Sequence, residues 1–81
     1  MRLDYAPTAT RALEKTTTRI RKAFYKQVGF LLQDLHHPSL HAKKYSESED
    51  LWQARVNDDW RFYFRIAGDV YRIEAIRKHP K

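Results

Sequence analysis

The sequence predicts an α+β fold of two layers, in which an antiparallel sheet packs against a helical hairpin. One observation is the stretch 19–35, whose apolar side chains recur at the spacing of a helix. The other is the region 51–77, where apolar and polar side chains alternate as they do in strands. Together they give the order β-α-α-β-β-β in a two-layer sandwich, within a single domain that spans residues 1–81.

The N-terminal half is expected to form a short strand and two helices. Residues 2–6 alternate, and Pro7 ends this strand and suits the first turn of a helix that continues over residues 8–15. Three consecutive threonines then interrupt the helix, because β-branched residues are poor in a helix interior but can cap the next helix. The buried stripe of the helix 19–35 consists of Ile20, Phe24, Val28, Leu31 and Leu35.

The C-terminal half is expected to be a charged connection followed by an antiparallel meander. Pro38 ends the second helix, and residues 40–50 form the connection. The polar turn Asn57-Asp58-Asp59 joins two strands, and Gly68 permits the next tight turn into a last strand at residues 70–77. The first strand of the chain must pair with this meander.

The alternation gives the predicted sheet one apolar face and one basic face. The apolar face contains Trp52, Ala54, Val56, Trp60, Phe62, Phe64 and Ile66. In the last strand, Tyr71, Ile73 and Ala75 share one face, and Val70, Arg72, Glu74 and Ile76 share the other. The basic face contains Gln53, Arg55, Arg61, Tyr63 and Arg65.

Composition limits the kind of protein that this can be. The chain has 16 lysines and arginines against 10 acidic residues, and its formal net charge of +6 favours a polyanion or an acidic protein as partner. It has no cysteine and only two glycines, which argues against disulfides, thiolate metal sites and glycine-rich nucleotide loops. No signal peptide or membrane-spanning apolar run is evident, so we expect a cytoplasmic protein without a membrane partner.

The basic face is the strongest candidate for a functional site. Antiparallel pairing brings Arg55 and Arg61 close together, and guanidinium groups bind phosphate in a forked geometry. Tyr63 offers a ring on which an RNA base can stack. The alternative is a solvated outer face, in which Glu74 pairs with Arg61 or Arg65. The candidate RNA-binding residues are Lys43, Lys44, Gln53, Tyr63, Arg65, Arg77, Lys78 and Lys81.

His79 is the candidate general base. It follows Arg77 and Lys78 at the end of the last strand, where positive charge favours a neutral imidazole. Such an imidazole can accept the proton of a ribose 2′-hydroxyl while an arginine stabilises the charge that develops on the phosphate. This chemistry cleaves RNA by transesterification without a metal or another cofactor, and its catalytic candidates are Arg55, Arg61 and His79. The alternative is an ordinary surface histidine near the chain end.

A metal site among the other histidines is not expected. His36, His37 and His41 have no recognised zinc spacing, and no cysteine supports them. The helix dipole is a sufficient alternative explanation for these histidines, because a positive charge is favourable at a helix C-terminus.

Several segments of the chain resemble the RelE/ParE superfamily of small bacterial toxins. The matching segments are HPSL at 37–40, AKK at 42–44, LWQARV at 51–56, WRFYFRI at 60–66 and IEAIRKHPK at 73–81. The length and the β-α-α-β-β-β order also fit, so the resemblance covers essentially the whole chain.

The resemblance implies the toxin of a type II toxin–antitoxin pair, with a cognate antitoxin as protein partner. RelE-like members cleave mRNA in the ribosomal A site and use basic residues of the sheet without a metal, which makes the ribosome and mRNA expected partners. By position, Arg61 matches the arginine that binds the scissile phosphate, and Arg55 matches a basic residue on the preceding strand. His79 matches the catalytic histidine or arginine of relatives, and Lys43 and Lys44 match basic residues that contact the RNA backbone.

The sequence departs from the RelE-like pattern at two places. Gln53 stands where some relatives have a lysine. Many relatives continue into a tail with a functional tyrosine, whereas this sequence ends at Lys81, and Tyr63 is then the candidate for stacking. Two other functions therefore stay open: a ParE-like toxin that inhibits DNA gyrase without RNA cleavage, and an inactive member that only binds an antitoxin.

Overall fold

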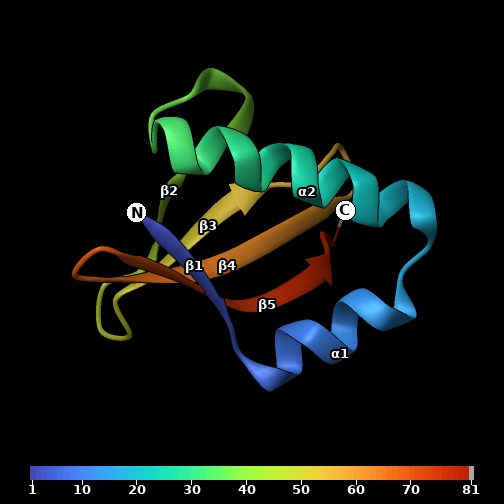
Figure 1. Ribbon diagram of the computed structural model, residues 1–81, viewed down its shortest axis with the longest axis horizontal. Coiled ribbons are helices and arrows are strands. Elements are labelled where there is room, and N and C mark those ends of the chain that lie inside the picture. The colour runs from blue at the N-terminus through green and yellow to red at the C-terminus, as the bar shows by residue number, and fades with distance from the viewer. Residues whose placement is uncertain (81) are drawn as a thin grey trace.

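The computed structural model describes residues 1–80 and contains a five-stranded sheet with a long helix across one face (Figure 1). Its elements are β1 (Arg2–Tyr5), α1 (Pro7–Lys15), α2 (Thr18–Gln33), the 3₁₀ helix η1 (Pro38–Leu40), β2 (Lys43–Ser46), β3 (Leu51–Arg55), β4 (Trp60–Ala67) and β5 (Val70–Lys78). The predicted α+β class is confirmed. One candidate RNA-binding residue, Lys81, lies outside the described residues.

The sheet has one strand more than the sequence predicts. β2 forms inside the segment expected to be a charged connection, and it pairs antiparallel with β3. The strand order is β1-β5-β4-β3-β2, so β1 and β2 are the two edges. β1 runs parallel to β5, which makes the sheet mixed and not wholly antiparallel. A short, charged edge strand such as β2 carries too little apolar alternation to be predicted from pattern.

The two helices meet at a corner fixed by polar groups. Thr17 caps α2, as the threonine run predicts, because its hydroxyl accepts the N–H of Ile20 at 3.3 Å. Arg21 of α2 donates to the carbonyls of Leu13 at 3.2 Å and Thr16 at 2.5 Å, which end α1. In Figure 1, α2 lies over the sheet and α1 lies beside β5. Within residues 1–80, no helix has the length and apolarity needed to cross a membrane.

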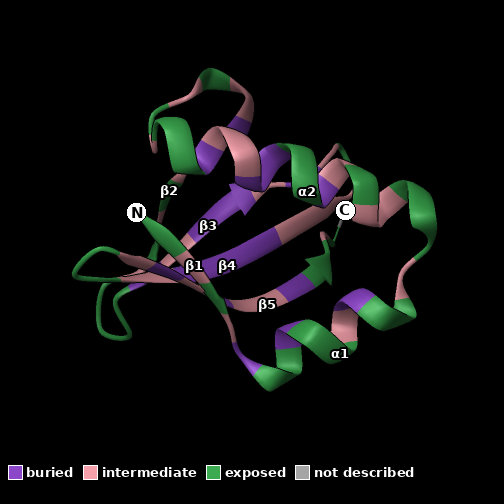
Figure 2. Cartoon of the chain, viewed as in Figure 1, coloured by how far each residue is buried: buried purple, intermediate pink, exposed green. Residues whose placement is uncertain are grey.

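An aromatic core joins α2 to the sheet. Phe24 of α2 and both Phe62 and Phe64 of β4 are fully buried. The rings of Phe24 and Phe62 meet edge to face with centroids 5.3 Å apart, a favoured aromatic geometry. Figure 2 shows that buried residues occupy the middle of the strands and the side of α2 that faces them, while the turns at residues 47–50 and 67–69 are exposed.

A bulge changes which residues of β5 face this core. The pairing register of β4 with β5 shifts between Tyr63 and Phe64, so Tyr63 pairs with Ala75 while Phe64 pairs with Ile73. Ile76 then turns inward and is 4% exposed. The predicted faces of Ala75 and Ile76 are therefore wrong, because strict alternation cannot reveal an extra residue in one strand.

Candidate nucleic-acid interface

Three arginines lie side by side across three neighbouring strands. Arg55 of β3 pairs with Arg61 of β4, and Arg61 pairs with Arg77 of β5. Residues directly opposite in a sheet share a face, so these side chains form one line, which we call the arginine row. Like charges in such positions repel one another, and an anion bound across them relieves that repulsion.

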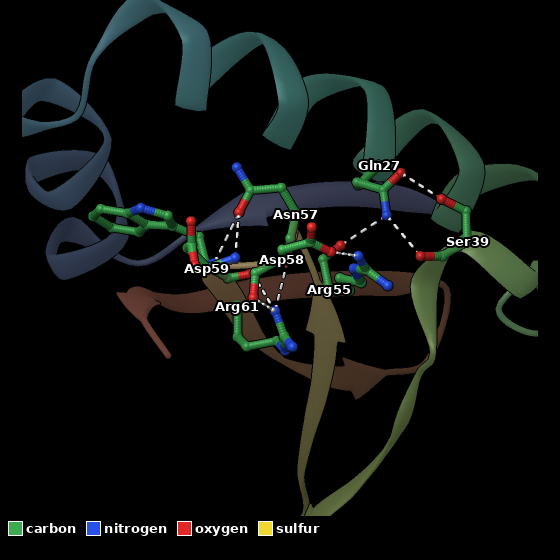
Figure 3. Close-up of polar contacts among 8 residues, drawn as sticks. Gln27, Ser39, Arg55, Asn57, Asp58, Asp59 and Arg61 are labelled. Atoms are coloured by element: carbon green, nitrogen blue, oxygen red, sulfur yellow. Dashed lines mark hydrogen bonds and ion pairs between the residues drawn. The ribbon is translucent and has the colours of Figure 1, made fainter. Parts of the chain in front are cut away.

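The turn between β3 and β4 holds two members of the arginine row (Figure 3). Nη1 of Arg61 donates to the carbonyls of Asn57 at 2.6 Å and Trp60 at 3.0 Å. Arg55 forms an ion pair with Asp58. The turn itself is set by the side-chain oxygen of Asn57, which accepts two backbone N–H groups, those of Trp60 and the residue before it, both at 2.9 Å.

The structure brings His79 to the arginine row. The backbone N–H of His79 donates to the carbonyl of Asp59 at 2.6 Å, which ties the end of β5 to the same turn. A cavity of about 420 Å³ opens beside these groups, and its lining includes His41, Lys43, Gln53, Arg55, Arg61 and His79. The three predicted catalytic residues therefore share one cavity.

A buried glutamine that the sequence analysis missed holds the end of β3, which carries Arg55 (Figure 3). Gln27 of α2 is 5% exposed, and its Nε2 donates to the carbonyls of Ser39 at 3.0 Å and Arg55 at 2.8 Å. Its Oε1 accepts the hydroxyl of Ser39 at 2.9 Å. Gln27 thus joins α2, η1 and the end of β3. The sequence does contain a signal for this residue, because Gln27 is a polar side chain beside Val28 in the apolar stripe, and a buried polar group needs hydrogen-bond partners.

Two residues predicted to contact RNA are largely buried. Tyr63 is 5% exposed and Gln53 is 7% exposed, so little of either side chain is accessible, although Gln53 lines the cavity. Burial is the largest cause of a raised pKa for Tyr63, with Tyr45 adding to it and Arg77 and Arg61 opposing it. The ring of Tyr63 is not available for the stacking role expected of it. The exposed aromatic side chain on this face is Tyr45, which lies on the strand that the sequence did not predict.

The lysines divide between the two faces of the sheet. Lys43 pairs with Gln53, lines the cavity and belongs with the arginine row. Lys44 pairs with Trp52 and therefore lies on the opposite face, where its ammonium contacts Asp50 at 2.6 Å. This hydrogen bond to Asp50 is the largest cause of a raised pKa for Lys44. Lys78 pairs with Trp60 and also points to the α2 side, so the predicted placement of both residues on the basic face is wrong.

Arg65 belongs to an ion-paired region and not to the arginine row. Its Nη1 lies 3.1 Å from a carboxylate oxygen of Glu74, and its Nε donates to the carbonyl of Glu49 at 3.1 Å. Arg72 contacts Glu74 at 3.0 Å and Asp4 at 2.6 Å. The interpretation of this face as a solvated, ion-paired surface is correct for Arg65. Glu74 pairs with Arg65 and not with Arg61.

The histidines between α2 and β2 have structural contacts. His37 stacks on Phe30 with ring centroids 3.9 Å apart, and its Nδ1 accepts the N–H of Ser39 at 3.2 Å. His41 adopts the left-handed conformation with φ of 47° at the end of η1. In the part of the chain that the structure describes, no group of three or more histidine, cysteine or acidic side chains is arranged to hold a metal ion.

Comparison with known proteins identifies the fold. No family model matches the sequence, and no curated protein matches it. Solved structures match over almost the whole chain, among them a YoeB/ParE toxin from Agrobacterium tumefaciens with a TM-score of 0.83 and 15% identity, which covers 99% of this chain and 100% of that one. The chain has the fold of the RelE/ParE toxins.

Two further RelE-fold structures are toxins in complex with their antitoxins. The archaeal RelE–RelB complex from Pyrococcus horikoshii matches with a TM-score of 0.78 and 17% identity, covering 95% of this chain and 92% of that one. The intact RelBE toxin–antitoxin complex of E. coli matches with a TM-score of 0.76 and 13% identity, covering 99% of this chain and 98% of that one. The resemblance seen in the sequence is confirmed for the fold.

Proposed function

We propose that this protein is the toxin of a type II toxin–antitoxin pair and that it cleaves mRNA on the ribosome without a metal, which would place it in the cytoplasm. The observation that carries the proposal is the cavity shared by Arg55, Arg61 and His79. Three strands and one turn fix these groups, so a phosphate in the cavity would meet two guanidiniums and one imidazole. The RelE/ParE fold supports the same proposal.

The proposed reaction is a transesterification within the RNA strand. The ribose 2′-oxygen attacks the adjacent phosphorus while its proton passes to the imidazole of His79. The bond from phosphorus to the 5′-oxygen breaks, and that oxygen leaves with a proton from an acid or from water. The products are a 2′,3′-cyclic phosphate and a 5′-hydroxyl. Arg61, whose guanidinium is held by the carbonyl of Asn57, stabilises the added negative charge on the phosphate oxygens, and Arg55 holds the strand.

We propose that the protein partner is a cognate antitoxin with an acidic or amphipathic segment that covers the arginine row. The net charge of +6 and the repulsion among the guanidinium groups of the row favour such a segment. The solved RelE–RelB and RelBE complexes support an antitoxin as the partner.

Primer extension on translated mRNA tests the proposal. The purified protein should produce cuts within codons only when ribosomes are present. A parallel assay measures supercoiling by DNA gyrase, the target of the alternative toxin class. Gyrase inhibition without RNA cuts would replace the proposed function with that alternative. Binding to an antitoxin with neither activity would identify an inactive member of the fold.

A further inference from the structure

Tyr45 is an exposed aromatic residue on the same face as the arginine row. It lies in the edge strand β2, and 54% of its surface is accessible. Its ring meets the ring of Tyr63 at 70° with centroids 5.0 Å apart, and both rings border one groove. A large aromatic side chain held in place by a second ring has already lost part of its conformational freedom, so less is lost when a ligand binds.

Arg77 connects this aromatic pair to the arginine row. Its guanidinium carbon lies 4.8 Å from the centre of the Tyr63 ring, and Arg77 also pairs with Arg61 across β4 and β5. Tyr63 and Arg61 are two residues apart on one strand, which separates them by about 7 Å. One nucleotide of an extended strand spans a comparable distance.

The groove beside Tyr45 is separate from the cavity that holds His79. It has a volume of about 640 Å³, and its lining includes Leu51, Ala75, Arg77 and both tyrosines. Arg65 also lines the groove but is ion-paired with Glu74, so Arg77 is the guanidinium placed to hold a phosphate beside apolar side chains that suit a flat nucleobase. An acidic peptide would bring several carboxylates toward Glu49 and Glu74, which also border the groove, whereas one nucleotide brings a single phosphate to Arg77.

We propose that Tyr45 forms a stacking platform for the RNA base next to the cleaved bond, with Arg77 holding the phosphate between that base and the cavity. The inference rests on the proposed function and adds a base-binding site to it. Tyr45 then contributes to the choice of cleavage position, and the exposed hydroxyl is not required for stacking.

Binding of short RNAs at low salt tests the platform. The probes carry 2′-O-methyl groups, so that they bind without being cleaved, and each probe lacks the base at one position. We expect one abasic position to weaken binding to the wild-type protein by about tenfold, the effect of losing one base–aromatic stack. In Tyr45→Ser, the intact probe should bind as weakly as that abasic probe does. Tyr45→Phe should restore the wild-type pattern.

Tyr25→Ser is the matched control, because Tyr25 is 53% exposed on α2. It should leave the abasic pattern unchanged. The platform is refuted if no single abasic position matters to the wild-type protein, or if Tyr45→Ser weakens only binding to an antitoxin. Failure of the proposed function would look different, because the wild-type protein and Arg61→Ala would then bind the intact probe equally weakly.

Discussion

Arg55 and Arg61 are already engaged by the turn between their strands, and this affects how they bind a phosphate. Arg55 pairs with Asp58, whose side chain is 85% exposed. Arg61 donates to backbone carbonyls, which carry no net charge and so do not neutralise its guanidinium. An incoming phosphate therefore competes with a carboxylate for Arg55 and finds Arg61 positioned without such competition.

Asp58→Asn removes the carboxylate that competes for Arg55. We expect RNA to bind more tightly at low salt, with the slope of log affinity against log salt steeper by about 0.7 for one more phosphate contact. The free energy of unfolding should change by less than about 1 kcal/mol, because the pair is at the surface. Fluorescence anisotropy over a salt series measures the first effect, and urea unfolding measures the second.

Asp69→Asn is the control for the charge change, since Asp69 pairs with Arg2 at 3.5 Å, far along the sheet from the arginine row. If both variants bind RNA with the same affinity and salt slope, the gain comes from net charge alone. The competition at Arg55 would then be excluded.

At the level of elements, Gln27 carries the largest predicted effect on stability. It joins α2, η1 and β3 through three hydrogen bonds, all with buried or half-buried partners. Gln27→Leu leaves the carbonyls of Ser39 and Arg55 without this donor, which should lower the free energy of unfolding by about 2–4 kcal/mol. Urea denaturation measures the loss.

The same substitution at an exposed position of α2 serves as reference. Gln33→Leu should change the free energy of unfolding by less than about 0.5 kcal/mol. Equal effects at the two positions would show that the polar network of Gln27 does not support β3.

The elements also show what the sequence can and cannot predict. Strong periodicity in α2, β3 and β4 led to the correct fold and to Arg55 and Arg61 on one face. The strand β2 was not predicted because it has only four residues, two of them lysines, and lies at an edge of the sheet, so Tyr45 was not recognised either. The bulge near Tyr63 exchanges the faces of Ala75 and Ile76, and the alternation of apolar and polar residues does not reveal it.

For the whole molecule, buried and half-buried tyrosines predict sensitivity to alkaline pH. Burial is the first cause of raised pKa values for Tyr5, Tyr63 and Tyr71, each above its ordinary value of 10.0. A raised pKa means that the folded protein holds the phenol proton more tightly than the unfolded chain does. The corresponding stability is present in full below pH 10.0 and is lost as the pH rises above it toward the raised values.

Urea midpoints measured from about pH 8 to about pH 11 should fall toward the alkaline end. Tyr63→Phe should show a shallower fall, since it has no phenol to ionise at that position. An equally steep fall in Tyr63→Phe would show that this tyrosine does not contribute to the pH dependence.

The molecule separates two tasks between the faces of one sheet. Aromatic side chains hold α2 against one face, while the other face carries the arginine row and its cavity. The region around Arg72, on the same face as the row, is ion-paired with Asp4 and Glu74 and provides a reference arginine. Arginines of the arginine row should affect RNA cleavage, and Arg72 should not.

The decisive measurement is primer extension on translated mRNA with Arg61→Ala and Arg72→Ala beside the wild-type protein. Circular dichroism first establishes that each variant is folded. If Arg61→Ala does not fold, Arg61→Lys replaces it, because lysine keeps the charge but lacks the forked guanidinium. We expect Arg61→Ala to slow ribosome-dependent cleavage by about 100- to 1,000-fold, the effect of losing one group that stabilises a developing anion. Arg72→Ala should cleave like the wild-type protein. A folded Arg61→Ala protein that cleaves at the wild-type rate would contradict the phosphate role of the arginine row.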